Sequence, residues 1–202
     1  MTSISSITLQ SQDPSAAERF YADAFELDAP VAFSAADAPS SGFRGFTLSL
    51  LVSQPADVHA LIDPAVKAGA RVLKPAGKSF WGYGGVIEAP DGAIWKVATS
   101  NKRDRGPASR KVESVVLLIG ADDVAASKRF YVERGLKVDK SFGSRYVQFD
   151  TASAPFGFAL YGRKALAKDA GTEVEGSGSH RIVIGSDGGS FTDPDGFAWT
   201  AG

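Results

Sequence analysis

The stretch Ala89-Pro90-Asp91-Gly92-Ala93-Ile94-Trp95 recurs near the end of the chain as Asp193-Pro194-Asp195-Gly196-Phe197-Ala198-Trp199. In both copies proline presets φ, aspartate can cap the adjacent backbone and glycine accepts a positive φ, which predicts a tight turn between two strands. A second pair of similar segments precedes these turns, since Pro14-Ser15-Ala16-Ala17-Glu18-Arg19-Phe20-Tyr21 resembles Val124-Ala125-Ala126-Ser127-Lys128-Arg129-Phe130-Tyr131. Because both pairs keep the same order, the sequence predicts a duplicated structure.

The boundary between the two copies is visible in the composition. Residues 101–111 are polar, contain Gly-Pro and have no apolar periodicity, which predicts a solvated linker. We therefore predict a first domain over residues 1–100 and a second over residues 112–202. A chain of 202 residues is long enough for two domains of about 100 residues each.

Each copy is predicted to open with a short strand and an amphipathic helix. Asp13 before Pro14 predicts the N-terminus of the first helix, and Asp122 or Asp123 that of the second. A further helix is expected over Ala56–Ala68 in the first domain alone, because the second domain passes almost directly from Gly185 to Phe191. The strands expected are Ile4–Leu9, Val31–Ser34, Gly45–Val52, Gly84–Glu88, Ile94–Ala98, Val115–Ile119, Arg145–Asp150, Phe156–Gly162 and His180–Gly185.

The composition excludes several classes of function. Twenty-two Lys and Arg residues balance 23 Asp and Glu residues, so the chain lacks the basic field that nucleic acids and anionic membranes attract. Without cysteine it can form no disulfide, thiolate nucleophile or cysteine-ligated metal site. No stretch approaches the about 20 apolar residues of a membrane span, and no signal-peptide pattern occurs at the N-terminus. We expect a cytoplasmic protein with neither a nucleic-acid nor a membrane partner.

The duplicated order of strand, helix ending in Arg-Phe-Tyr, further strands and Pro-Asp-Gly hairpin resembles the vicinal oxygen chelate superfamily. This superfamily includes glyoxalase I, extradiol dioxygenases and bleomycin-resistance proteins. Lys78–Gly85 and Ala159–Gly171 are especially similar to its glyoxalase and bleomycin-resistance branch. The resemblance extends from Ile4 to Trp199 and implies an α+β fold of two βαβββ modules whose curved mixed sheets enclose a cavity. Such modules pair within a chain or across a dimer, so we expect a monomer with paired modules or a homodimer.

The enzymes of this superfamily bind a divalent metal through His, Gln or Glu side chains. The resemblance places these ligand positions at Ser6 and Val116, Phe46 and His180, Lys96 and Thr200, and near Phe158 to Leu160. His180 is the one ordinary metal ligand in this set, whereas a stable site needs three or more protein donors. We therefore expect no metal and no other cofactor.

Strand alternation around these positions predicts which side chains face the cavity. By the same rule Trp95 and Trp199 face away from it and pack against the helices that end in Phe-Tyr. Trp81 and Tyr83 stand among glycines in a segment that rims the cavity in the superfamily. The predicted ligand-binding set is Phe46, Leu48, Trp81, Tyr83, Lys96, Tyr146, Tyr161 and His180.

These features favour three functions in a definite order. An apolar cavity with aromatic side chains suits a hydrophobic or aromatic small molecule, so the first is a metal-independent binding protein that resembles drug-sequestering antibiotic-resistance proteins. The second is a glyoxalase-like lyase or isomerase in which His180 is the catalytic general base and Lys96 holds an anion. The third is a structural or regulatory protein whose cavity is filled by its own side chains.

Overall fold

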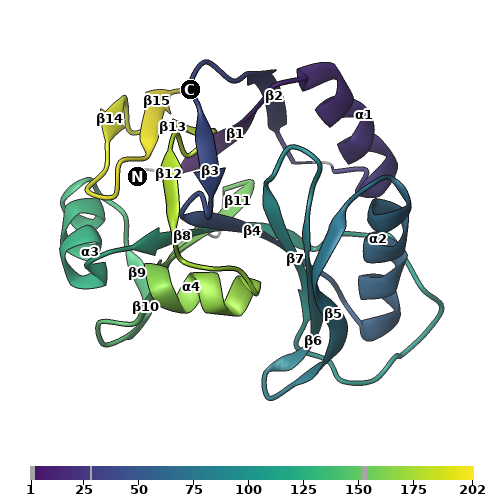
Figure 1. The fold of residues 1–202 in the computed structure, drawn as a ribbon. Coiled ribbons are helices and arrows are strands. Elements are labelled where there is room, and N and C mark those ends of the chain that lie inside the picture. The colour runs from purple at the N-terminus through teal and green to yellow at the C-terminus, as the bar shows by residue number, and fades with distance from the viewer. Residues whose placement is uncertain (1–2, 28, 152–153) are drawn as a thin grey trace.

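The computed structural model describes residues 3–27, 29–151 and 154–202, and within them four helices accompany two large sheets and one small sheet (Figure 1). The helices are α1 (Pro14–Ala24), α2 (Pro55–Lys67), α3 (Val124–Glu133) and α4 (Arg163–Ala170). The eight-stranded sheet has the order β5 (Arg71–Ser79), β6 (Gly82–Glu88), β7 (Ile94–Thr99), β4 (Phe46–Leu51), β8 (Ser114–Ala121), β11 (Phe156–Gly162), β10 (Tyr146–Phe149) and β9 (Val138–Phe142). The five-stranded sheet has the order β14 (Phe191–Thr192), β15 (Ala198–Ala201), β13 (Ile182–Ser186), β1 (Ile4–Ser11) and β2 (Val31–Ala35), and β12 (Gly176–Gly178) pairs with β3 (Ser40–Gly42).

The eight-stranded sheet consists of two βαβββ units, one running from β4 to β7 and the other from β8 to β11. In each unit the last strand lies parallel to the first, so that Leu48 pairs with Trp95 and Ile119 with Leu160. At the centre of the sheet, β4 and β8 run antiparallel. The predicted α+β class and its two βαβββ units are therefore present, and the units begin at β4 and β8.

The five-stranded sheet is built from the two ends of the chain. β1 and β2 come from the N-terminal part, whereas β13, β14 and β15 come from the C-terminal part. β1 and β13 run antiparallel, with Ile7 opposite Ile184. Consequently, residues 1–100 and residues 112–202 each contribute strands to both large sheets (Figure 1).

The helix starts follow the capping residues in the sequence. Asp13 accepts a hydrogen bond from Ala16 N at 2.9 Å, and Asp123, not Asp122, caps α3. The described residues contain no helix between β13 and β14, as expected. The second half nevertheless has a second helix, α4, which follows β11 directly.

The main core lies where α1, α2 and α3 meet both large sheets. Trp95 and Trp199 are fully buried there, and their ring centroids lie 5.4 Å from Tyr21 and 5.5 Å from Tyr131. Both tryptophans are thus core residues that pack against the Phe-Tyr ends of α1 and α3, as the alternation predicted.

Candidate functional site

The two faces of the eight-stranded sheet differ in what covers them. Leu48 faces the main core with Trp95, whereas Ser49 shares the opposite face with its strand partners Lys96 and Val116. On this opposite face α4 packs against β4, β8 and β11. In Figure 1, α4 lies below β4 and β8.

Helix α4 fills the middle of this face through a small apolar cluster. Leu166, Ala167 and Ala170 are buried against residues that include Leu118. Gly120 permits this approach, because a Cβ atom there would lie 3.3 Å from Leu166 Cδ2 and closer still to the α4 backbone. The middle of this face is therefore covered by the protein's own side chains.

Beside α4 the face remains open as a pocket of about 450 Å³. It lies between the β5–β6 hairpin, β7 and the C-terminal end of α4. Its described lining includes Leu51, Lys74, Trp81, Val86, Lys96 and Asp169. Two residues of the predicted ligand-binding set, Trp81 and Lys96, line this one pocket, and Tyr83 borders it.

Trp81 stands at the tip of the β5–β6 hairpin and is 83 % exposed. Its ring meets that of Phe80 edge to face, with centroids 4.9 Å apart. The other two tryptophans, Trp95 and Trp199, are buried. An indole ring this exposed beside a pocket is available to stack on a flat ligand.

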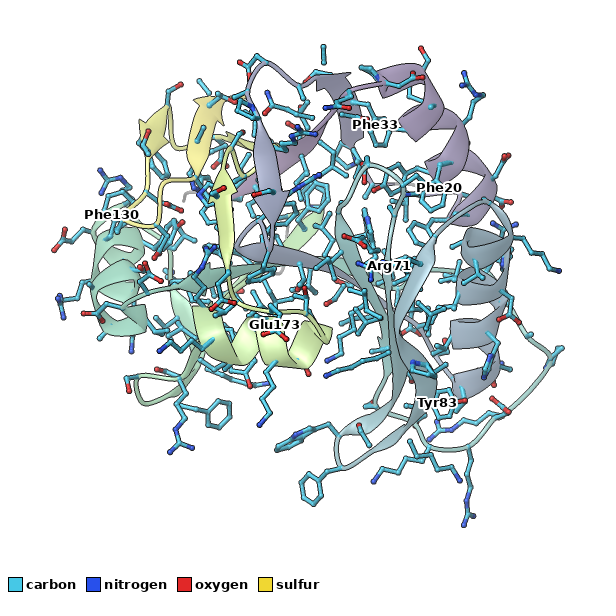
Figure 2. All side chains as sticks on the ribbon, viewed as in Figure 1. Phe20, Phe33, Arg71, Tyr83, Phe130 and Glu173 are labelled. Atoms are coloured by element: carbon cyan, nitrogen blue, oxygen red, sulfur yellow. The ribbon has the colours of Figure 1, made fainter. Side chains whose placement is uncertain are left out.

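Tyr83 lies on β6 near the same hairpin tip (Figure 2). Its hydroxyl oxygen is 2.8 Å from His59 Nε2 on α2, and the two rings are 5.7 Å apart. The Tyr83 side chain is therefore held on the α2 side of the hairpin, on the face of β6 opposite the one that pairs Val86 with Lys96.

Two lysines of the pocket contact the C-terminal end of α4. Lys96 Nζ on β7 lies 2.7 Å from Asp169 Oδ2. Lys74 Nζ donates to the backbone oxygens of Lys168 at 2.6 Å and Asp169 at 2.7 Å. These carbonyls end the helix, where a cation complements the helix dipole.

Sequence reasoning missed Lys74 and Asp169, both of which line this pocket. Nothing local distinguishes Lys74 from an ordinary surface lysine. Asp169 lies two residues before Gly171, and a glycine is a signal for a helix end that the sequence does show; in the structure Gly171 is the C-cap, with a φ of 78°. That signal does not say which strand the helix end meets.

The other predicted site residues lie elsewhere. Phe46 and Leu48 are buried in the main core, and Phe46 packs edge to face against Phe197. The expectation that these two face the cavity with Lys96 is corrected by the register, since Lys96 pairs with Ser49. Tyr146 and Tyr161 form a cross-strand pair on β10 and β11 with ring centroids 5.9 Å apart, and they do not line this pocket.

Comparison with known proteins identifies the architecture. No family profile and no curated protein sequence match this chain. Glyoxalase I from Zea mays superimposes with a TM-score of 0.65 over 98 % of this chain and 91 % of its own, at 14 % sequence identity. A variant of the same maize enzyme matches with a TM-score of 0.63, 15 % identity and 98 % coverage of this chain. The chain has the glyoxalase I fold. At such low identity the match establishes the fold and not the reaction.

The glyoxalase I fold implies a divalent metal, but the donor positions of this chain do not fit one. The positions that the resemblance assigned to ligands carry Ser6, Val116, Phe46, Lys96 and Thr200 beside His180. Phe46 is buried in the core, and Lys96 is paired with Asp169. Among the residues that the structure describes, no three His, Asp or Glu side chains gather closely enough to hold a metal ion.

His180 is held by the backbone within this fold. Its ring stacks on Phe197 at 3.9 Å, Nδ1 lies 2.5 Å from Arg44 O, and Nε2 lies 3.1 Å from Asp195 O. Both ring nitrogens thus face carbonyl oxygens, and neither presents a free lone pair to a ligand. His180 does not line the pocket beside α4.

Within the described part of this glyoxalase I fold, every helix is too short or too polar to cross a bilayer.

Proposed function

We propose that this protein binds a hydrophobic or aromatic small molecule, without a metal, in the pocket between the β5–β6 hairpin, β7 and α4. The observation that carries the proposal is the exposed Trp81 ring at a pocket of about 450 Å³. This volume lies within the range of roughly 300–1,000 Å³ that is typical of small-molecule sites. Sequestration of a drug or carriage of a metabolite would both use such a site.

The walls of the pocket support an aromatic ligand. Ala98 provides apolar surface, and Leu51 is 39 % exposed at its edge. Burial of apolar surface favours binding by about 25 cal/mol per Å², and an aromatic pair adds roughly 0.5–1.5 kcal/mol. A flat ring stacked on Trp81 would gain from both effects.

The alternative, a lyase or isomerase with His180 as general base, receives no support from the placement of that residue. A general base needs a free lone pair within reach of the substrate proton. His180 directs both nitrogens to the carbonyl oxygens of Arg44 and Asp195. We therefore propose binding and assign no reaction.

The test is a titration with N-phenyl-1-naphthylamine, an uncharged aromatic probe that fluoresces when its surroundings become apolar. The substitution Trp81→Ala is expected to weaken binding roughly threefold to tenfold, the affinity change that corresponds to one lost aromatic contact. The control is Phe142→Ala, since Phe142 is 65 % exposed on β9 at the opposite edge of the same sheet. Equal affinity in the wild type and Trp81→Ala, or equal losses in both variants, would contradict the proposal.

A further inference from the structure

We infer that the ligand of this pocket is an aromatic molecule with an acidic group, whose anion replaces the Asp169 carboxylate on Lys96. The inference rests on the proposed function and adds the charge of the ligand to it. It also gives α4 a role, because the helix end occupies the position that the ligand anion would take.

The first argument is the charge of the pocket. Lys74 and Lys96 lie on its face of the sheet, each opposite Val86, and its described lining contains one carboxylate, Asp169. Lys78 pairs with Tyr83 and lies on the α2 side of the hairpin instead. The whole chain carries a net charge of −1, so this excess of positive charge is a local property of the pocket. Cations that gather in a partly enclosed site attract anionic ligands.

The second argument is that the two lysines are not equivalent. Lys74 donates to the carbonyl oxygens of Lys168 and Asp169 and is thereby committed to the end of α4. Lys96 has only a side-chain partner, Asp169, among the contacts of the described residues. A ligand anion can therefore reach Lys96 without removing the cation that caps the helix.

The third argument is that the Lys96–Asp169 pair can be exchanged at little cost. Its side chains are 35 % and 41 % exposed, and ion pairs that are this accessible to water contribute little to stability. Leu166, Ala167 and Ala170 hold α4 on the sheet independently of the pair. The carboxylate of Asp169 can thus rotate away while the helix stays in place.

Together these contacts define the arrangement of the ligand. Trp81 and Lys96 line the same pocket, one providing an exposed aromatic surface and the other an ammonium group. A flat ring would lie against Trp81, and a carboxylate or sulfonate on that ring would accept hydrogen bonds from Lys96 Nζ.

The test compares two probes with the same aromatic skeleton. One is N-phenyl-1-naphthylamine, which is neutral, and the other is 8-anilinonaphthalene-1-sulfonate, which carries one negative charge. Lys96→Gln is expected to lower the affinity for the sulfonate probe about fivefold and to change the affinity for the neutral probe less than twofold. Asp169→Asn is expected to raise the affinity for the sulfonate probe about threefold, because the Asp169 carboxylate no longer competes with the probe for Lys96.

Matched variants separate the local effect from the net charge. Lys140→Gln removes a cation from β9, at the opposite edge of the sheet, and Glu133→Gln removes an anion from the end of α3. Both controls are expected to leave the affinities of both probes within twofold of the wild type. Lys96→Arg retains the charge and is expected to keep most of the sulfonate affinity, which distinguishes lost charge from misfolding.

The outcomes distinguish the two proposals. If Trp81→Ala weakens neither probe, the proposed binding function is wrong. If Trp81→Ala weakens both probes but Lys96→Gln and Asp169→Asn leave the sulfonate probe unchanged, the binding function stands and the inference about the acid is wrong. An equal change in both probes on Lys96→Gln also overturns the inference.

Discussion

At the scale of single residues, the two repeated segments meet in two tyrosine–aspartate contacts. The Tyr21 hydroxyl lies 3.1 Å from both carboxyl oxygens of Asp91 and accepts a hydrogen bond from Trp95 Nε1 at 3.0 Å. In the second half the Tyr131 hydroxyl donates to Asp193, which lies on the other side of the hairpin proline. The helix ends and the hairpins are thus joined in both halves, but through aspartates that do not correspond.

The buried carboxyl group of Asp193 predicts an effect of pH on stability. Burial raises its pKa above the ordinary 3.8, although hydrogen bonds from Tyr131 and Phe197 N oppose this shift. A raised folded-state pKa means that stability is present below 3.8 and is lost as the pH rises through the folded pKa. We expect the unfolding free energy of the wild type, relative to that of Asp193→Asn, to fall as the pH rises from 3.8 through the folded-state pKa and then to level off. Urea titrations of both proteins at several pH values measure it.

Asp187 supplies a control of the opposite sign. Hydrogen bonds from Ser3 N and the Ser3 hydroxyl lower its pKa below 3.8. Its contribution to stability is therefore present above 3.8 and is lost as the pH falls through the lowered folded-state pKa. The stability of the wild type relative to Asp187→Asn should thus rise with pH over that interval. A rise in the Asp193→Asn comparison would contradict the assignment.

At the scale of elements, α4 covers part of the face of the eight-stranded sheet opposite the main core and leaves the pocket beside it open. The helix ends at Gly171, where the backbone turns with a φ of 78°. The C-terminal carbonyls of α4 accept hydrogen bonds from Lys74, and Asp169 pairs with Lys96. Consequently, one lysine of the pocket caps the C-terminal end of α4, and the same helix end supplies the carboxylate that pairs with the other lysine.

Gly171→Ala is expected to destabilise the protein by about 1–2 kcal/mol, since an L side chain is strained at this φ. A Cβ atom would also lie 2.9 Å from Lys74 Cγ, which pushes away the side chain that caps α4. Urea unfolding monitored by circular dichroism gives the change in free energy.

Gly143→Ala is the matched control for this substitution. Gly143 has a φ of 59°, and nothing lies within 4 Å of a Cβ atom there. It therefore carries the backbone strain without the contact. If Gly143→Ala costs as much as Gly171→Ala, the contact with Lys74 contributes nothing.

At the scale of the whole molecule, both large sheets cross the boundary between the predicted domains. β4 pairs with β8 at the centre of one sheet, and β1 pairs with β13 at the centre of the other. One apolar core contains residues from both halves, among them Trp95 and Trp199. Each half separated from the other would expose two strand edges and part of this core.

We therefore expect residues 1–111 and residues 112–202, expressed separately, to lack a cooperative unfolding transition. Mixed together, they are expected to form a one-to-one complex with the circular dichroism spectrum of the intact chain. Size-exclusion chromatography and thermal denaturation measure both properties. A cooperative transition in either half alone would mean that the pairing across the boundary is dispensable.

The local features of this protein were determined by the sequence itself. Asp13 and Asp123 cap their helices, and the Pro-Asp-Gly segments form their turns, because each of these contacts joins residues close in the chain. The burial of Trp95 and Trp199 followed from strand alternation. Strand alternation counted from the family positions placed Leu48 toward the cavity, which was wrong, because Leu48 pairs with Trp95 and is buried in the core.

Only the tertiary structure decided which segments lie together. The pairing of β4 with β8 depends on backbone hydrogen bonds between strands more than 60 residues apart, and strand patterns do not encode a choice of partner. The meeting of Asp169 with Lys96 depends on where α4 lands on the sheet. The candidate pocket therefore could not be read from the sequence, because its charged residues come together only through long-range packing of α4 against β5–β7.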